Sequence, residues 1–147
     1  MSQPDLQIDP RGPRLGAFVP LTLSIVALIL GPGIGAIVIF AVLVALFLPG
    51  AIIGPQATAQ GWVFRTFIRP RIGAPLATES FRPPRFAQQV GLTFALIALV
   101  FAIAGIGLGF FIFAGFLTFA AFLQGVFDFC LGCEMYLLFK RFTTKTA

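Results

Sequence analysis

Two long stretches of the chain contain no charged residue, and they define the elements that the sequence predicts. The first runs from Leu15 to Phe64 and the second from Phe86 to Phe127. One helix needs about 20 apolar residues to cross a bilayer, so each stretch is long enough for two crossings and a turn. The segments "GPGIG" (Gly31–Gly35) and "GIGLG" (Gly105–Gly109) divide the stretches, because glycine permits tight reversals and proline ends helices.

The sequence therefore predicts an all-α membrane protein with four transmembrane helices, in a single domain that covers residues 1–147. The helices form two tandem hairpins, because a short turn divides each apolar stretch. The expected helices are Leu15–Leu30, Ile34–Ile53, Phe86–Ala104 and Leu108–Phe127.

Composition supports a membrane protein over the alternative, a buried helical hairpin of a soluble one. Hydrophobic residues make up 59% of the chain and charged residues only 10%, whereas soluble domains carry about a quarter charged residues. The chain has no histidine, which excludes imidazole-based acid–base catalysis and histidine-ligated metal.

All ten basic residues fall on one side of this four-helix arrangement, and the two glycine turns carry none. Two precede the first helix, five lie in a central loop of about 54–85, and three lie in the tail. They are Arg11, Arg14, Arg65, Arg69, Arg71, Arg82, Arg85, Lys140, Arg141 and Lys145. The positive-inside rule then places both termini and the central loop on the cytoplasmic side of the membrane. We expect the loop arginines to bind a partner protein, an anion or lipid headgroups, and we expect no nucleic-acid partner.

The two halves of the chain resemble each other. "PRLGAFVPLTLSIVAL" (from Pro13) aligns with "PRFAQQVGLTFALIAL" (from Pro84), and a "GIG" follows in each half. The sequence predicts an internal repeat, with units at about 11–70 and 82–142, related by an axis along the membrane normal. Each hairpin then precedes a short amphipathic segment at the interface, where "WVFRTFIR" aligns with "EMYLLFKR".

The only two cysteines, Cys130 and Cys133, belong to the second unit and have no counterpart in "QATAQG" of the first. A C-x-x-C pair can form a disulfide, pass a persulfide, ligate a metal or simply pack. Reactivity requires a thiolate, which nearby cations favour. The negative charges of Asp128 and Glu134 disfavour a thiolate. The expected position of the cysteines late in the fourth helix disfavours it as well. A reducing compartment makes a structural disulfide rare, which favours a catalytic, redox or metal-binding pair.

Other polar residues in the apolar stretches have simpler interpretations. We expect Asp128 to lie at the interface and to pair with Arg85 or Arg71. Gln88 and Gln89 are candidates for hydrogen bonds between helices. No cofactor is predicted, and zinc or an iron–sulfur cluster would require a dimer that brings four cysteines together.

The segments "RPRIGAPLATESFRPPRFAQQVG" (69–91) and "CLGCEMYLLFKR" (130–141), with "IDPRGPRLGA" before them, carry a family resemblance. Together they resemble the bacterial membrane family described as domain of unknown function 4395. This resemblance implies a four-helix inner-membrane protein whose genes neighbour rhodanese-type sulfurtransferases or thioredoxin-like proteins. It brings no catalytic role with it, but it makes Cys130 and Cys133 the best functional candidates.

Three hypotheses of function follow. In the first, the chain is a membrane-bound thiol module that exchanges electrons or sulfane sulfur with a cytoplasmic rhodanese- or thioredoxin-like partner. One of Cys130 and Cys133 attacks and the other resolves the intermediate. The second is a transporter, or a transporter subunit, for a small sulfur species. The third is a structural or assembly subunit of a larger membrane complex or homo-oligomer.

Overall fold

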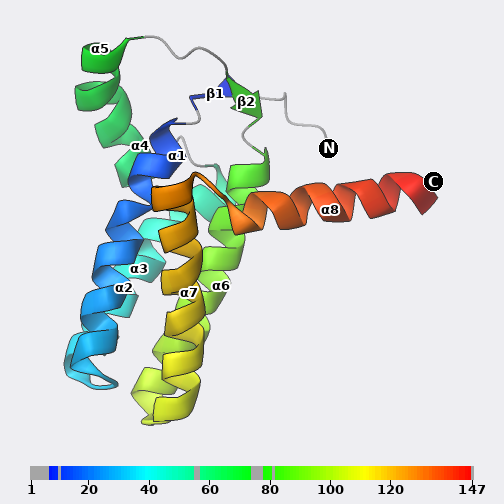
Figure 1. Cartoon of the computed structure of the whole chain (residues 1–147). Coiled ribbons are helices and arrows are strands. Elements are labelled where there is room, and N and C mark those ends of the chain that lie inside the picture. Colours follow the sequence, from blue (N-terminus) through cyan, green and yellow to red (C-terminus); the bar gives the residue numbers. More distant parts are fainter. Residues whose placement is uncertain (1–6, 10, 55–56, 74–77, 81, 147) are drawn as a thin grey trace.

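A bundle of four long helices forms the body of the molecule (Figure 1). The computed structural model describes residues 7–9, 11–54, 57–73, 78–80 and 82–146, so part of the predicted loop of 54–85 lies outside the described residues. The bundle helices are α2 (Phe18–Leu30), α3 (Ile34–Ile52), α6 (Arg82–Ala104) and α7 (Gly107–Phe127). All four are long and apolar enough to cross a membrane, α2 together with the short α1 (Arg11–Gly16) that precedes it. The prediction of a multi-pass helical membrane protein is confirmed.

Prolines explain where two of these helices begin. Pro20 has no N–H to donate to the carbonyl of Gly16, and the helix is interrupted at Ala17, between α1 and α2. The helix α6 begins at Arg82 rather than at the predicted Phe86, with Pro83 and Pro84 in its first turn. Proline suits this position because the first N–H groups of a helix have no intrahelical partner.

Small side chains let α6 pack closely on α3. Gly91, Ala95, Ala98 and Ala102 form a buried stripe along α6 at a spacing of three or four residues. The buried residues of α3 facing this core include two phenylalanines, Phe40 and Phe47. A Cβ atom at Gly91 would lie 2.8 Å from the ring of Phe47. Close approach over small residues is how helices associate in lipid, where no hydrophobic effect drives them together.

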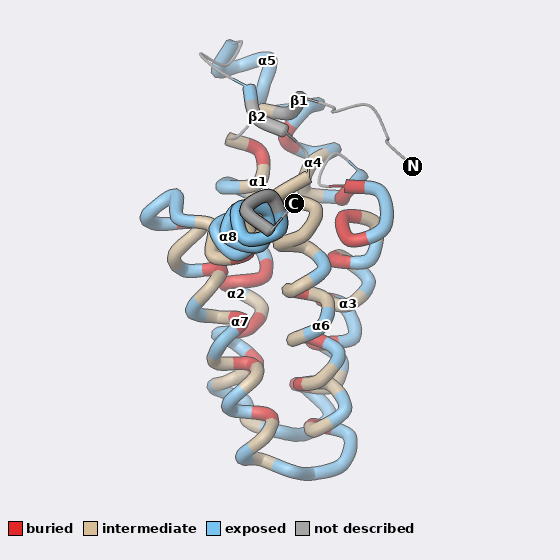
Figure 2. The backbone as a smooth tube through the Cα atoms, turned by 90° about the vertical axis from the view of Figure 1, so that its right-hand side faces the viewer, coloured by how far each residue is buried: buried red, intermediate tan, exposed pale blue. Residues whose placement is uncertain are grey.

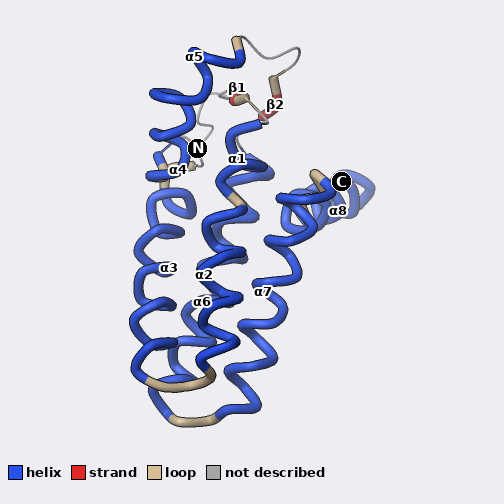
Figure 3. The backbone as a smooth tube through the Cα atoms, turned by 60° about the vertical axis from the view of Figure 1, so that its left-hand side comes forward, coloured by secondary structure: helices blue, strands red, loops and turns tan. Residues whose placement is uncertain are grey.

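The two hairpin turns lie together at one end of the bundle (Figure 3). Gly31 and Gly105 occupy the left-handed region there, with φ of 74° and 76°. Apolar residues near these turns, such as Ile34 at 82% exposure, face outward. Figure 2 shows the buried positions along the inner sides of the helices and the exposed ones outside, which is the pattern expected of helices surrounded by lipid.

The opposite end, which we call the basic end, carries every basic residue of the chain and the remaining elements. The strands β1 (Gln7–Ile8) and β2 (Glu79–Ser80) pair antiparallel there. The segments α4 (Ala59–Val63), η2 (Phe64–Ile68, a π-helix) and α5 (Arg69–Ile72) follow α3, and α8 (Leu131–Thr146) follows α7. Each hairpin is thus followed by a helical segment, as predicted.

These two segments lie differently. The segment α4–η2–α5 rises beyond the end of the bundle, whereas α8 passes α6 and projects sideways from the bundle (Figures 1 and 3). Phe64 of η2 is buried, and a Cβ atom at Gly12 of α1 would lie 3.2 Å from its ring. This contact with α1 holds the first segment upright. The expected position flat on the membrane surface therefore fits α8 better than α4–η2–α5.

Two arginines each bind the C-terminal end of a helix in the other hairpin. Arg14 of α1 donates from Nε to the carbonyl of Gly125, at 3.3 Å in the last turn of α7. Arg85 of α6 donates from Nε to the carbonyl of Ala51, at 3.4 Å in the last turn of α3, and Gln89 donates to the same oxygen at 3.0 Å. The last carbonyls of a helix lack intrahelical partners, so these side chains act as caps. Arg14 and Arg85 are equivalent in the predicted repeat, which itself stays a prediction.

An ion pair joins the N-terminal segment to the end of α5. Arg11 contacts Asp9 at 2.8 Å and donates a second hydrogen bond of 2.8 Å to the carbonyl of Gly73. The Asp9 side chain is only 6% exposed. Hydrogen bonds from Arg11 hold the pKa of the Asp9 carboxyl below its ordinary value, although burial acts in the opposite direction.

This pair predicts acid-sensitive stability. A carboxyl whose pKa is lowered by folding stabilises the fold above its unfolded pKa, about 3.9, and this contribution is lost as the pH falls through the folded pKa. We therefore expect Asp9→Asn to lower the melting temperature at neutral pH. The difference from the wild type should shrink below about pH 4. Thermal unfolding in detergent at several pH values measures this, with the exposed carboxylate variant Glu134→Gln as control. A difference that is independent of pH would contradict the assignment.

Candidate functional site

The chain breaks between α7 and α8, directly before the two cysteines. Asp128 takes a left-handed conformation with φ of 56°, and the N–H groups of Asp128 and Phe129 both donate to the carbonyl of Leu123. Such a residue ends a helix, and aspartate tolerates the conformation better than most. The predicted position of the cysteines late in the fourth helix is therefore wrong. They lie at the start of a separate helix.

Cys130 precedes the first residue of α8 and Cys133 lies in its first turn. The carbonyl of Cys130 accepts a hydrogen bond of 3.0 Å from the N–H of Glu134, and its Sγ accepts one of 3.2 Å from the N–H of Cys133. Cys130 thus acts as the N-cap of α8. The two cysteines are joined by a disulfide, and their Cα atoms lie 5.1 Å apart. This separation lies within the range for bonded cysteines.

The helix start changes the electrostatics expected for the pair. The N-terminus of a helix carries partial positive charge, which favours a thiolate. Asp128 and Glu134 are both exposed to solvent, which weakens the opposition expected from their charges. Asp128 forms no ion pair with Arg85 or Arg71 in the part of the chain that the structure describes, so that prediction is also wrong. The reason is that Asp128 ends α7, while Arg85 turns toward α3.

Gly132, between the cysteines, lets the first turn of α8 rest on α6. A Cβ atom there would lie 2.5 Å from the backbone Cα of Ala87. One turn later, the rings of Tyr136 and Phe139 pack on Phe86 of α6, with centroids at 5.8 and 6.4 Å. These contacts fix the direction of α8 and hence the position of the disulfide against the bundle.

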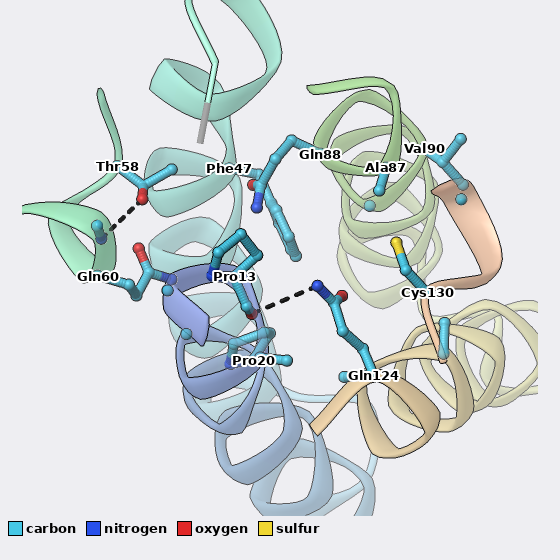
Figure 4. A pocket seen from close by; sticks show the side chains of 18 of the residues that line it. Pro13, Pro20, Phe47, Thr58, Gln60, Ala87, Gln88, Val90, Gln124 and Cys130 are labelled. Carbon is cyan, nitrogen blue, oxygen red and sulfur yellow. Dashed lines mark hydrogen bonds between the residues drawn. The ribbon is translucent and has the colours of Figure 1, made fainter. Parts of the chain in front are cut away.

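A cavity of about 470 Å³ lies beside the disulfide, at the basic end. Its walls come from both hairpins, from α1, from α4–η2–α5 and from the start of α8. Figure 4 shows the sulfur of Cys130 pointing into it, opposite Gln88 and Gln124. Gln124 donates from Nε2 to the carbonyl of Pro13 at 3.3 Å, and the Oε1 atom of Gln60 is buried without a hydrogen-bond partner.

The loop arginines do not form one group. Arg65 and Arg69 line the aqueous end of the cavity. Arg85 caps α3, and Arg71 and Arg82 lie at the basic end outside the cavity lining. Gln89 makes the expected hydrogen bond between helices, whereas Gln88 packs on Gly50, where a Cβ atom would lie 2.7 Å from its Oε1.

Sequence reasoning missed Thr58, Gln60, Gln124 and Gly132, and the predicted repeat held a signal for the first of these. In its register, Thr58 aligns with Cys130 and Gly61 with Cys133. Thr58 is the N-cap of α4, and its Oγ1 accepts a hydrogen bond of 2.9 Å from the N–H of Gly61. Thr58 and Cys130 therefore make the same local contact, and both line the cavity. The second unit carries sulfur where the first carries a hydroxyl.

Within the described residues, no three His, Cys, Asp or Glu side chains gather in a way that could hold a metal ion. The chemistry that this arrangement offers is that of the disulfide itself, beside a mostly apolar cavity with amide groups in its wall.

The contact at Gly132 predicts that a methyl group there displaces α8. We expect Gly132→Ala to cost about 1–3 kcal/mol of stability, as overpacking does, and to speed maleimide labelling of Cys130 in a Cys133→Ser background. Gly115 of α7 has no neighbour within 4 Å of an added Cβ, so Gly115→Ala is the matched control and should be neutral or stabilising. Equal melting temperatures and labelling rates for the two variants would show that the contact does not hold α8.

Comparison with known proteins gives one match. A family model described as domain of unknown function (DUF4395) matches residues 8–141, nearly the whole chain. No curated protein and no solved structure matches. The match covers the four bundle helices, both cysteines and most of α8. The chain therefore belongs to the DUF4395 family.

Proposed function

We propose that the chain is a membrane-bound thiol–disulfide exchange module, with Cys130 and Cys133 as its redox pair. One observation carries the proposal: the pair is in disulfide contact at the N-terminus of a helix, on the wall of a cavity. The proposal is electron exchange rather than transfer of sulfane sulfur, because two cysteines this close in the chain can close an intramolecular disulfide on oxidation. The partner is a cytoplasmic protein with a thioredoxin- or rhodanese-like thiol.

The two cysteines have different roles in this proposal. Leu131 and Met135 share one face of α8 and line the cavity, as Cys130 does. Cys133 lies on roughly the opposite face, which it shares with the exposed Lys140 two turns later. We therefore take Cys133, which lies outside the cavity lining, as the sulfur that the partner attacks. The Sγ of Cys130 receives the hydrogen bond at the helix N-terminus, which makes it the better leaving thiolate.

The exchange proceeds in two balanced steps. A thiolate of the partner attacks Sγ of Cys133, a mixed disulfide forms, and Cys130 leaves as the thiolate. A second thiolate of the partner then attacks the partner's sulfur that is bonded to Cys133. Cys133 leaves as a thiolate. The partner gains a disulfide, and Cys130 and Cys133 become a dithiol, so two electrons have passed to the membrane protein.

We further propose that the basic end faces the cytoplasm of a bacterial inner membrane. All ten basic residues lie at this end, and the turn end carries none. Cytoplasmic loops are enriched in lysine and arginine, which gives the orientation. The exposed Leu137, Leu138 and Phe142 of α8 then suit the interface between lipid and cytoplasm.

Trapping of a mixed disulfide tests the exchange. We expect Cys130→Ser to accumulate a covalent complex with the oxidised partner. The thiolate of Cys133 attacks the partner's disulfide, the reverse of the second step, and the variant lacks the thiolate of Cys130 that would then displace the partner from Cys133. Cys133→Ser should capture several-fold less of the same partner. Non-reducing electrophoresis and mass spectrometry of the affinity-purified protein measure both.

The double variant Cys130→Ser/Cys133→Ser is the control for captured background. The exchange proposal is wrong if neither single variant forms a covalent complex and both variants complement a deletion strain.

Labelling from each side of the membrane tests the orientation. In the cysteine-free double variant, Arg141→Cys introduces a thiol at the basic end and Leu108→Cys one at the turn end, where Leu108 is 76% exposed. A membrane-impermeant maleimide should label position 141 in inverted vesicles and position 108 in intact spheroplasts. The reverse pattern would refute the cytoplasmic placement.

A further inference from the structure

The cavity beside Cys130 is graded from polar to apolar. Its volume, about 470 Å³, is ample for a small-molecule ring. Charged groups come from the segments outside the bundle, amide groups from α4 and from the ends of α6 and α7, and three aromatic rings from farther inside α6 and α7. In this order the lining residues include Asp9, Arg65 and Arg69; Gln60, Gln88 and Gln124; and Phe94, Phe116 and Phe119.

The aromatic end reaches the outer surface of the bundle. Phe94 of α6 stacks on Phe116 of α7, with ring centroids 6.1 Å apart. Phe116 is 57% exposed and Phe119 is 54% exposed. Both lie on a helix that is apolar enough to cross a membrane, so the surface they reach faces lipid. The cavity therefore suits an amphiphile whose polar ring lies near Cys130 and whose apolar tail extends into the bilayer.

The amide groups indicate the chemistry of that ring. The Oε1 atom of Gln60 is buried without a partner, and such an acceptor needs a donor. A glutamine amide also carries donors of its own, so it binds a carbonyl as well as a hydroxyl. Asp9, the acidic residue of the lining, is already paired with Arg11. The middle of the cavity thus suits a neutral group that alternates between carbonyl and hydroxyl.

The proposed redox cycle requires such a group. After the partner has been oxidised, Cys130 and Cys133 are a dithiol and must lose two electrons before the next exchange. We propose that the cavity binds a lipid-soluble quinone that accepts these electrons. The two S–H bonds break, the disulfide forms, and two electrons and two protons convert the quinone to the quinol. This inference rests on the proposed thiol–disulfide exchange and names its electron acceptor.

Binding is tested separately from redox chemistry. We expect decylubiquinone to bind the purified cysteine-free variant Cys130→Ser/Cys133→Ser in detergent, as measured by calorimetric titration. Gln60→Leu and Gln88→Leu should each raise its Kd at least tenfold. Thr93→Val is the matched control, because Thr93 lies on the same helix as Gln88 but is exposed and outside the cavity lining, and its Kd should stay within about twofold. Thermal unfolding confirms that each variant is folded.

The redox step is tested on the reduced wild type. Adding decylubiquinone should consume two thiols for each quinol formed, measured by thiol titration and quinol absorbance. Absence of binding, or Kd values for Gln60→Leu and Gln88→Leu equal to that of the Thr93→Val control, overturns the inference. Displacement of the quinone by equimolar dioleoylphosphatidylglycerol makes the site a phospholipid site and also overturns it. Binding without thiol oxidation overturns the role as electron acceptor, whereas the mixed-disulfide trap still decides the proposed function.

Discussion

The last carbonyl groups of α3 and α7 need donors from outside their own helices, and the structure at the basic end depends on how they obtain them. Arg14 binds the end of α7, and Arg85 with Gln89 binds the end of α3. An unpaired backbone group is costly next to lipid. The start of each hairpin is therefore tied to the end of the other, and the cavity lies between these two ties.

The same constraint positions the disulfide. α7 ends at Asp128 with its final carbonyls capped, so the chain is free to change direction and begin α8. Gly132 then lets α8 rest on Ala87 of α6, and the rings of Tyr136 and Phe139 on Phe86 fix its course. Cys130 lies at the corner, with its sulfur at the N-terminus of α8 and on the cavity wall. A pair placed within a continuous α7 would have had neither of these features.

The two hairpins are followed by matching local contacts. Thr58 and Cys130 both cap the helix that follows their hairpin, and both accept a hydrogen bond from an N–H three positions later. Any small side chain with a hydrogen-bond acceptor can serve as an N-cap. Sulfur at this position adds redox chemistry without changing the backbone. After the second hairpin α8 projects sideways from the bundle, whereas the contact of Phe64 with Gly12 holds α4–η2–α5 upright.

The sequence by itself determined the four apolar spans, their glycine turns and the gathering of all basic residues at one end. The length of an apolar span and the placement of basic residues can be predicted from the sequence alone, because neither depends on tertiary contacts. It also singled out Cys130 and Cys133. Only the tertiary structure decided how the helix that the pair begins lies against the bundle, because the contact at Gly132 depends on where α6 lies. The cavity, with Gln60 and Gln124 in its wall, was likewise beyond the sequence, since its residues come from segments far apart in the chain.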